Sequence, residues 1–195
     1  MTKRTALLVG AVALALLLAA CGSSGSASSS ATVDPNTVEV NPAGDIPDNQ
    51  AFVPYTVPSG DFSVTVPEGW SRNESAGVVT FTDNFNSIRL ETIGAAAAPT
   101  AASATADEVP ALAAATPAYQ AGDVTTVDRT AGTAVLISYQ AERTPDPVTG
   151  QPVTIDVERY EFWQGGREAI ITLSGGQGAD NVDPWRIVTD SFTWQ

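Results

Sequence analysis

The chain has 195 residues, a formal net charge of −13, one cysteine and no histidine. This acidic balance argues against binding to nucleic acid and against electrostatic docking on anionic lipid. The lack of histidine removes the commonest general base and the commonest transition-metal ligand. The single lysine, Lys3, lies near the N-terminus, so the rest of the chain has no residue for Schiff-base chemistry.

The first 20 residues have the pattern of a secretory signal peptide, with Lys3 and Arg4 followed by an uncharged apolar run from Leu7 to Ala20. A transmembrane anchor needs about 20 apolar residues, and this run is shorter. The run ends in Leu18-Ala19-Ala20-Cys21, which resembles the lipobox of bacterial lipoproteins. That resemblance implies lipid attachment at Cys21 through palmitate-type acyl chains, and a membrane-anchored protein on the extracytoplasmic face of the cell membrane.

Residues 21–47 are rich in Ser, Gly, Ala, Thr and Pro and show no apolar periodicity. They predict a flexible tether that holds the domain about 25–30 Å from the membrane. Residues 48–195 then fit a single domain. If the signal peptide is removed, seven arginines face 22 acidic residues, so the lipid must provide the membrane binding.

Alternating apolar residues predict the first strands of this domain. Residues 52–57 are predicted to form an entry or edge strand, because Pro54 has no backbone N–H to donate to a neighbouring strand. Residues 62–66 form a half-buried strand. Residues 78–82 and 87–93 read as an antiparallel hairpin turning at residues 83–86.

The period then changes to that of a helix at residues 107–116. Asp107 is the preferred N-cap, with Pro110 still early enough to be tolerated. A capping box at residues 105–108 is the alternative, but it places Pro110 one position deeper.

Four further strands are predicted at residues 124–129, 134–142, 153–163 and 167–173. The segment 145–152 is a hairpin loop rich in turn formers, and Gly165-Gly166 is a tight turn. Within 153–163 the apolar residues change from odd to even positions, which predicts a β-bulge near Glu158-Arg159.

A final helix is predicted to begin with Asp183 as N-cap and Pro184 at its first position. Trp185 and Val188 are predicted to pack on the sheet together with Ile187. Phe192 and Trp194 are interpreted as core residues rather than binding residues. The resulting fold class is α+β: a mainly antiparallel sheet covered by helices.

Two motifs were tested for chemistry. Residues 173–177 match the signature loop of ATP-binding-cassette ATPases. That loop works with a phosphate-binding Gly-Lys-Ser/Thr motif, which is absent here because the one lysine, Lys3, is followed by Arg4. Asp180 and Asp183, with Asn181, are a candidate weak calcium site, although helix capping already accounts for Asp183. The sequence singles out no carboxylate pair for glycoside hydrolysis.

Three segments resemble a known family: residues 48–55, 62–70 and 185–192. They are similar to actinobacterial lipoproteins of the LpqN type, which are related to the PsbP-like fold family. The resemblance implies a PsbP-like α/β/α sandwich that acts as a binding or assembly module without catalysis. It maps no functional residue of the family onto this chain.

We therefore predict a non-enzymatic, lipid-anchored binding module of the cell envelope, with no catalytic residue, cofactor or metal. Its partner would be an envelope protein or a small ligand. One alternative is an accessory subunit of an envelope transport or assembly complex. A further alternative is a carboxylate-based hydrolase.

Overall fold

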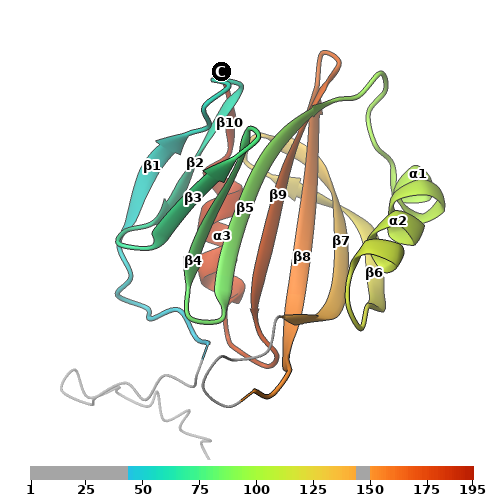
Figure 1. Cartoon of the computed structure of the whole chain (residues 1–195). Coiled ribbons are helices and arrows are strands. Elements are labelled where there is room, and N and C mark those ends of the chain that lie inside the picture. Colours follow the sequence, from blue (N-terminus) through green and yellow to red (C-terminus); the bar gives the residue numbers. More distant parts are fainter. Residues whose placement is uncertain (1–43, 144–149) are drawn as a thin grey trace, which may run out of the picture. The chain divides into compact units, whose positions relative to one another are not determined.

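A computed structural model describes residues 44–143 and 150–195, and two antiparallel sheets make up most of that part of the chain (Figure 1). The strands are β1 (Phe52–Thr56), β2 (Phe62–Pro67), β3 (Ser71–Ser75), β4 (Val78–Asp83), β5 (Asn86–Gly94), β6 (Gln120–Arg129), β7 (Gly132–Arg143), β8 (Val153–Gln164), β9 (Arg167–Gly176) and β10 (Thr193–Trp194). The helical segments are α1 (Ala101–Ser103), the π-helical turn η1 (Ala104–Glu108), α2 (Val109–Ala115) and α3 (Val182–Asp190).

The larger sheet has the strand order β3-β4-β5-β9-β8-β7-β6, and the smaller has the order β1-β2-β10. All of their described pairs are antiparallel, because hairpin turns join most neighbouring strands. The hairpin of β4 and β5 and the Gly165-Gly166 turn, with φ of 58° and 88°, are as predicted. The predicted antiparallel sheet is thus confirmed.

The main core lies between one face of the large sheet and a layer made of the small sheet and α3. Phe62 from β2, Ile171 from β9 and Val188 from α3 are among its buried residues. Phe192, predicted as core, is 1% exposed and stacks on Phe162 with ring centroids 4.2 Å apart. A smaller apolar cluster joins Ala104 of η1 to β7 on the opposite face.

The prediction of a sheet covered by helices is overstated. Strands β1, β2 and β10 supply much of the layer over the main core, and α3 supplies the rest (Figure 1). On the other face, the short run α1-η1-α2 packs near β6 and β7. Strands can provide this cover because alternating residues of β2 present one continuous apolar side.

Both predicted helix starts are wrong. The first helical run begins at Ala101, because Thr100 and Ser103 form a capping box, and Asp107 lies inside η1. The last helix begins at Val182, two residues after Asp180, with Asn181 at the N-cap position. Asp183 therefore lies in the first turn rather than capping it. Trp185 and Val188 are buried as predicted, but Ile187 is 46% exposed, so the prediction that it packs on the sheet is wrong.

The predicted bulge near Glu158-Arg159 is also wrong. Strand β8 keeps one continuous register with both neighbours. Its buried residues change phase because both faces are covered: Val157 is buried on one side and Tyr160 on the other. The register break lies in β6, between Ala121 and Val124.

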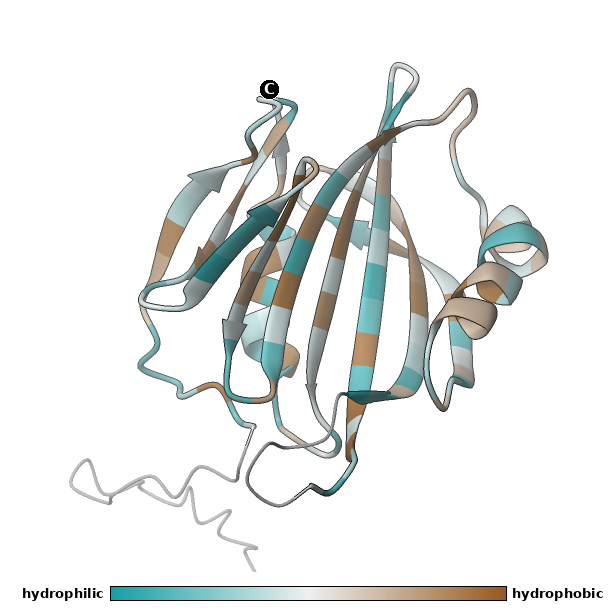
Figure 2. Cartoon of the chain, in the orientation of Figure 1, coloured by the Kyte–Doolittle hydropathy of each residue, from teal (hydrophilic) through white to brown (hydrophobic). Residues whose placement is uncertain are grey.

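Strand β3 was not predicted, because Ser71–Ser75 is polar and fully exposed (Figure 2). It pairs with β4 at the edge of the sheet, so backbone bonds rather than apolar burial form it. Most of the predicted 145–152 loop falls at residues 144–149, outside the described residues. Within the described ranges, no helix has the length and hydrophobicity needed to cross a bilayer.

Candidate binding pocket

The β6 bulge is the local feature that builds the candidate site. The Asp123 backbone N–H donates to Ser138 Oγ at 2.9 Å, and Ser138 Oγ–H donates back to the Asp123 carbonyl at 3.2 Å. Gly122 lies so close to β7 that an added Cβ would be 2.6 Å from the Ser138 carbonyl oxygen. Only glycine fits there, and bulges of this kind redirect the neighbouring side chains.

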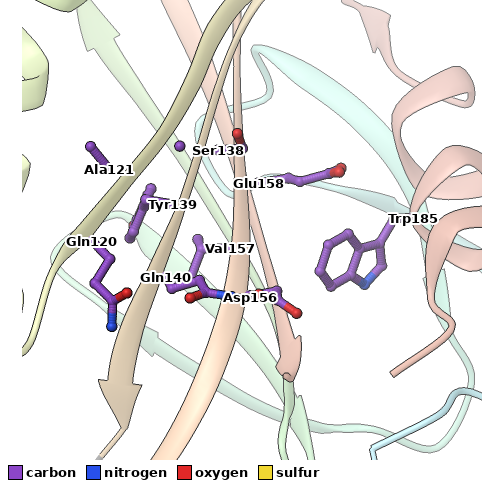
Figure 3. A pocket seen from close by; sticks show the side chains of 10 residues that line it. Gln120, Ala121, Ser138, Tyr139, Gln140, Asp156, Val157, Glu158 and Trp185 are labelled. Carbon is purple, nitrogen blue, oxygen red and sulfur yellow. Dashed lines mark hydrogen bonds between the residues drawn. The ribbon is translucent and has the colours of Figure 1, made fainter. Parts of the chain in front are cut away.

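Beside the bulge lies a pocket of about 310 Å³ between β6, β7, β8 and α3 (Figure 3). Its lining combines polar side chains with two aromatic residues, Tyr139 and Trp185. The residues that matter most are Gln120, Ser138, Gln140, Asp156, Glu158 and Trp185.

Asp156 and Glu158 are fixed in place by donors of the protein. Asp156 accepts from Gln140 Nε2 at 2.8 Å and from the Gly178 backbone N–H at 3.0 Å. Glu158 accepts from the Tyr160 hydroxyl at 2.6 Å. These bonds orient the two carboxylates before any ligand arrives.

Tyr160 links the pocket to an arginine on β6. Arg129 Nη2 donates to the Tyr160 hydroxyl at 2.9 Å, and its guanidinium lies 5.0 Å from the tyrosine ring. Burial and the bond to Glu158 raise the pKa of Tyr160. The hydroxyl therefore stays protonated and keeps donating to Glu158.

Trp185 forms the wall that α3 contributes, and in Figure 3 its indole points from the helix towards the strands of Asp156 and Glu158. Close approach of α3 depends on Gly175, where a Cβ would be 2.6 Å from Asn181 Nδ2 and 3.3 Å from the Trp185 ring. Asn181 also accepts from the Ile46 N–H at 2.8 Å, which fixes the start of the helix.

The charged groups of the lining are both acidic, and the amides and hydroxyl can both accept and donate hydrogen bonds. Such a lining favours a ligand that donates hydrogen bonds, whether a cationic amine or a neutral polyol. It disfavours an anion, because like charges repel at short range.

The residues singled out from the sequence lie elsewhere. Cys21 is outside the described residues. The Asp180 backbone N–H donates to Asp45 Oδ1, and Asn181 Nδ2 donates to the Gly44 carbonyl. In the described ranges, Asp180 and Asp183 belong to no group of three acidic side chains close enough to share a metal ion.

The pocket itself was missed. Asp156 and Glu158 occupy even positions of β8, on the face where Tyr160 is buried. Acidic residues on the same strand face as a buried tyrosine are the signal in the sequence that could have indicated a polar pocket. The facing partners Gln120 and Trp185 come from distant elements, and no local pattern joins them to β8.

No protein-family model matches the sequence, and no curated protein matches it. Solved structures do resemble the fold. The cyanobacterial PsbP of Synechocystis sp. PCC 6803 aligns with a TM-score of 0.50 at 13% identity, covering 75% of this chain and 94% of that one. This likeness shows a PsbP-like fold and carries no conclusion about activity.

Two weaker likenesses are of the same kind. The Ran-binding protein Mog1p of Saccharomyces cerevisiae has a TM-score of 0.47 at 12% identity, covering 74% of this chain and 95% of its own. LpqN of Mycobacterium tuberculosis, described as involved in cell envelope biogenesis, has 0.44 at 14% identity, covering 76% and 92%. The chain spans about half, 48%, of a similar protein from Bacteroides thetaiotaomicron.

Proposed function

We propose that this chain, with its PsbP-like fold, is a lipid-anchored binding protein on the extracytoplasmic face of the cell membrane. Its domain binds a small, hydrogen-bond-donating ligand in the pocket between β6, β7, β8 and α3. It performs no catalysis.

The anchor is supported by the sequence at the N-terminus. Basic residues, an apolar run of signal-peptide length and Leu18-Ala19-Ala20-Cys21 occur in the order that lipoprotein processing requires. Two or more acyl chains give stable membrane attachment where a single chain is marginal. The acidic domain adds no electrostatic attraction to the membrane, so attachment depends on Cys21.

The pre-formed pocket is the observation that carries the binding proposal. Asp156 and Glu158 are held by Gln140, Gly178 and Tyr160, so a ligand meets acceptors that need no rearrangement. Trp185 offers an apolar surface opposite them. This combination of an aromatic wall and a few oriented polar groups is typical of small-molecule sites.

The same bonds argue against a hydrolase. A general acid must present a proton to its substrate. Asp156 and Glu158 instead accept hydrogen bonds from Gln140, the Gly178 backbone N–H and Tyr160. They are placed to receive hydrogen bonds, which suits recognition.

The test is nuclear magnetic resonance of the full chain in detergent, with ¹⁵N-labelled tryptophan. Putrescine and galactose serve as donor-rich probes, and citrate serves as the anionic probe. We expect either donor-rich probe to shift the indole signal of Trp185, and citrate to leave it unchanged. The Asp156→Asn, Glu158→Gln double variant should bind at least about tenfold more weakly, because bonds to charged acceptors are lost.

The matched control is the Asp48→Asn, Glu74→Gln double variant, which makes the same charge change at exposed positions. It should bind like the unmodified chain. If no donor-rich probe shifts the Trp185 signal, or if the pocket variant binds with unchanged affinity, the pocket is not the binding site.

A further inference from the structure

Three glutamates meet on the other face of the large sheet, under the α1-η1-α2 run. Glu161 comes from β8, Glu168 from the neighbouring strand β9, and Glu108 from the last position of η1. One carboxylate oxygen of each lies within 4.8 Å of the others. These residues do not line the proposed ligand pocket.

Two of the three are buried without full hydrogen bonding. Glu168 is 5% exposed, and its Oε1 atom has no hydrogen-bond partner in the described ranges. Glu161 is 1% exposed, and its Oε2 atom has no partner. Native proteins rarely leave buried polar atoms unsatisfied, so a missing ligand is the natural explanation.

Arg159 neutralises the cluster only in part. Its Nε donates to Glu161 Oε1 at 2.7 Å, its Nη2 lies 3.3 Å from Glu108 Oε2, and its Nη1 lies 3.5 Å from Glu91 Oε1. Arg89 also pairs with Glu91. Four carboxyls therefore share two guanidinium groups, and two negative charges remain uncompensated when all the carboxyls are ionised.

The electrostatics agree with this deficit. Burial, followed by a hydrogen bond with Glu108, raises the pKa of Glu161 to about 8, although Arg159 lowers it. Burial and the charge of Glu108 also raise the pKa of Glu168.

Cavities reach the cluster from two sides. One of about 430 Å³ lies between α2 and the sheet and is lined by Glu108, Arg159 and Glu168, among others. Another of about 280 Å³ is lined by Glu161 and Trp163. An ion could enter through either cavity, and there is room for waters to complete its coordination.

We propose that Glu108, Glu161 and Glu168 form a binding site for a hard divalent cation, with Ca²⁺ the best match. Carboxylate oxygens are the preferred ligands of such ions. Oxygens on opposite sides of Ca²⁺ stand roughly 4.6–5.2 Å apart at its usual bond lengths. Only one pair of the three oxygens can lie on opposite sides of the ion, so an upper separation of 4.8 Å requires the side chains to move slightly closer together. The ion supplies the two missing positive charges and links η1 to the sheet.

Trp163 provides a direct probe of the site. It lies directly opposite Glu168 in the β8-β9 pairing, and its Nε1 is held by the Ala95 carbonyl at 2.9 Å. Tb³⁺ substitutes for Ca²⁺ at oxygen sites and emits when an adjacent tryptophan is excited. The experiment titrates the metal-free full chain in detergent with Tb³⁺, and then competes with Ca²⁺ and Mg²⁺.

We expect sensitised Tb³⁺ emission that Ca²⁺ displaces, and a Tm that rises with added Ca²⁺. Glu168→Gln should lower the affinity for Tb³⁺ and for Ca²⁺ at least about tenfold, because it removes a carboxylate that holds the metal. Trp163→Phe should lose most of the emission while keeping the Ca²⁺-dependent rise in Tm. Glu74→Gln, a change at an exposed glutamate, should behave like the unmodified chain.

Two results would overturn the proposal. One is an unmodified chain that shows neither sensitised emission nor a Ca²⁺-dependent Tm. The other is a folded Glu168→Gln variant with unchanged metal affinity. That result would mean that the three glutamates bind protons but no metal ion. Neither result bears on the ligand pocket, which shares no residue with this site.

Discussion

Glu161 shows how one buried side chain can set the pH response of the domain. It faces Glu108 of η1, Arg159 on its own strand, Glu168 of β9 and Glu91 of β5. Burial raises its pKa from 4.5 to about 8 in the folded state. Between these values, the folded chain holds a proton that the unfolded chain has released.

The free energy of unfolding of the metal-free chain should therefore fall as the pH rises from about 4.5 to 8, and level off above that. The stabilising contribution is complete below the lower pKa. Glu161→Gln should reduce this slope, because a neutral amide has no proton to lose, while Glu168, whose pKa is also raised, retains part of it. Urea unfolding in the presence of a chelator, at a series of pH values, measures the effect.

Glu74→Gln is the matched control, since Glu74 is exposed on β3 and should leave the slope unchanged. A metal-free chain whose stability is constant or rises across this range would show that Glu161 is not held protonated in the folded state.

At the scale of elements, the β6 bulge decides the shape of the pocket. Gly122→Ala places a methyl group within 2.6 Å of the Ser138 carbonyl oxygen, which belongs to the backbone and cannot move aside. We expect a loss of about 1–3 kcal/mol in unfolding free energy, as in other overpacked sites. Ligand binding should weaken as well, because Gln120 and Ala121 shift.

Gly94→Ala is the control, because no heavy atom within 4 Å would meet the added Cβ. Chemical denaturation of the two variants measures the difference. Equal unfolding free energies for Gly122→Ala and Gly94→Ala would mean that β6 can accommodate the added methyl group. The close contact at the bulge would then not define the pocket.

The elements also show what local sequence can and cannot predict. Alternation located β2, β4 and β5, because each buries one regular face. It also located β7, β8 and β9, although these strands bury residues of both faces. It failed for β3, which has no apolar face. The phase change in β8 was taken for a bulge, because the sequence does not show that η1 and α2 cover the second face.

Candidate sites were harder to predict than strands for the same reason. Glu161 and Glu168 are close because β8 and β9 pair in one particular register, and Glu108 joins them from η1. Asp156 and Trp185 likewise meet across β8 and α3. These distances depend on tertiary packing, so each residue looked like an ordinary surface acid or core aromatic in the sequence.

At the scale of the whole molecule, the end of the chain ties the two sheets together. Phe192 is 1% exposed and contacts Phe62 of β2, Phe162 of β8 and Trp194 of β10. Both layers depend on this cluster, because the helices cover only part of the large sheet.

Phe192→Ala should lower the free energy of unfolding by about 3–5 kcal/mol, the usual loss for a buried aromatic ring. The control is Ile187→Ala on nearby α3, which removes a side chain that is 46% exposed. It should change the free energy of unfolding by less than about 0.5 kcal/mol. Thermal and urea unfolding compare the two. A similar small effect for both would mean that the sheets hold together without the aromatic cluster.

We propose above that a lipid-anchored domain carries a small ligand in the pocket beside Trp185. Native mass spectrometry of the full chain, produced in a bacterial host and extracted from its membranes, tests the anchor and the ligand together. We expect a chain that begins at an acylated Cys21 and carries a non-covalent ligand, which the Asp156→Asn, Glu158→Gln variant loses. A chain that keeps residues 1–20 with an unmodified Cys21, or one that carries no ligand, would contradict this proposal.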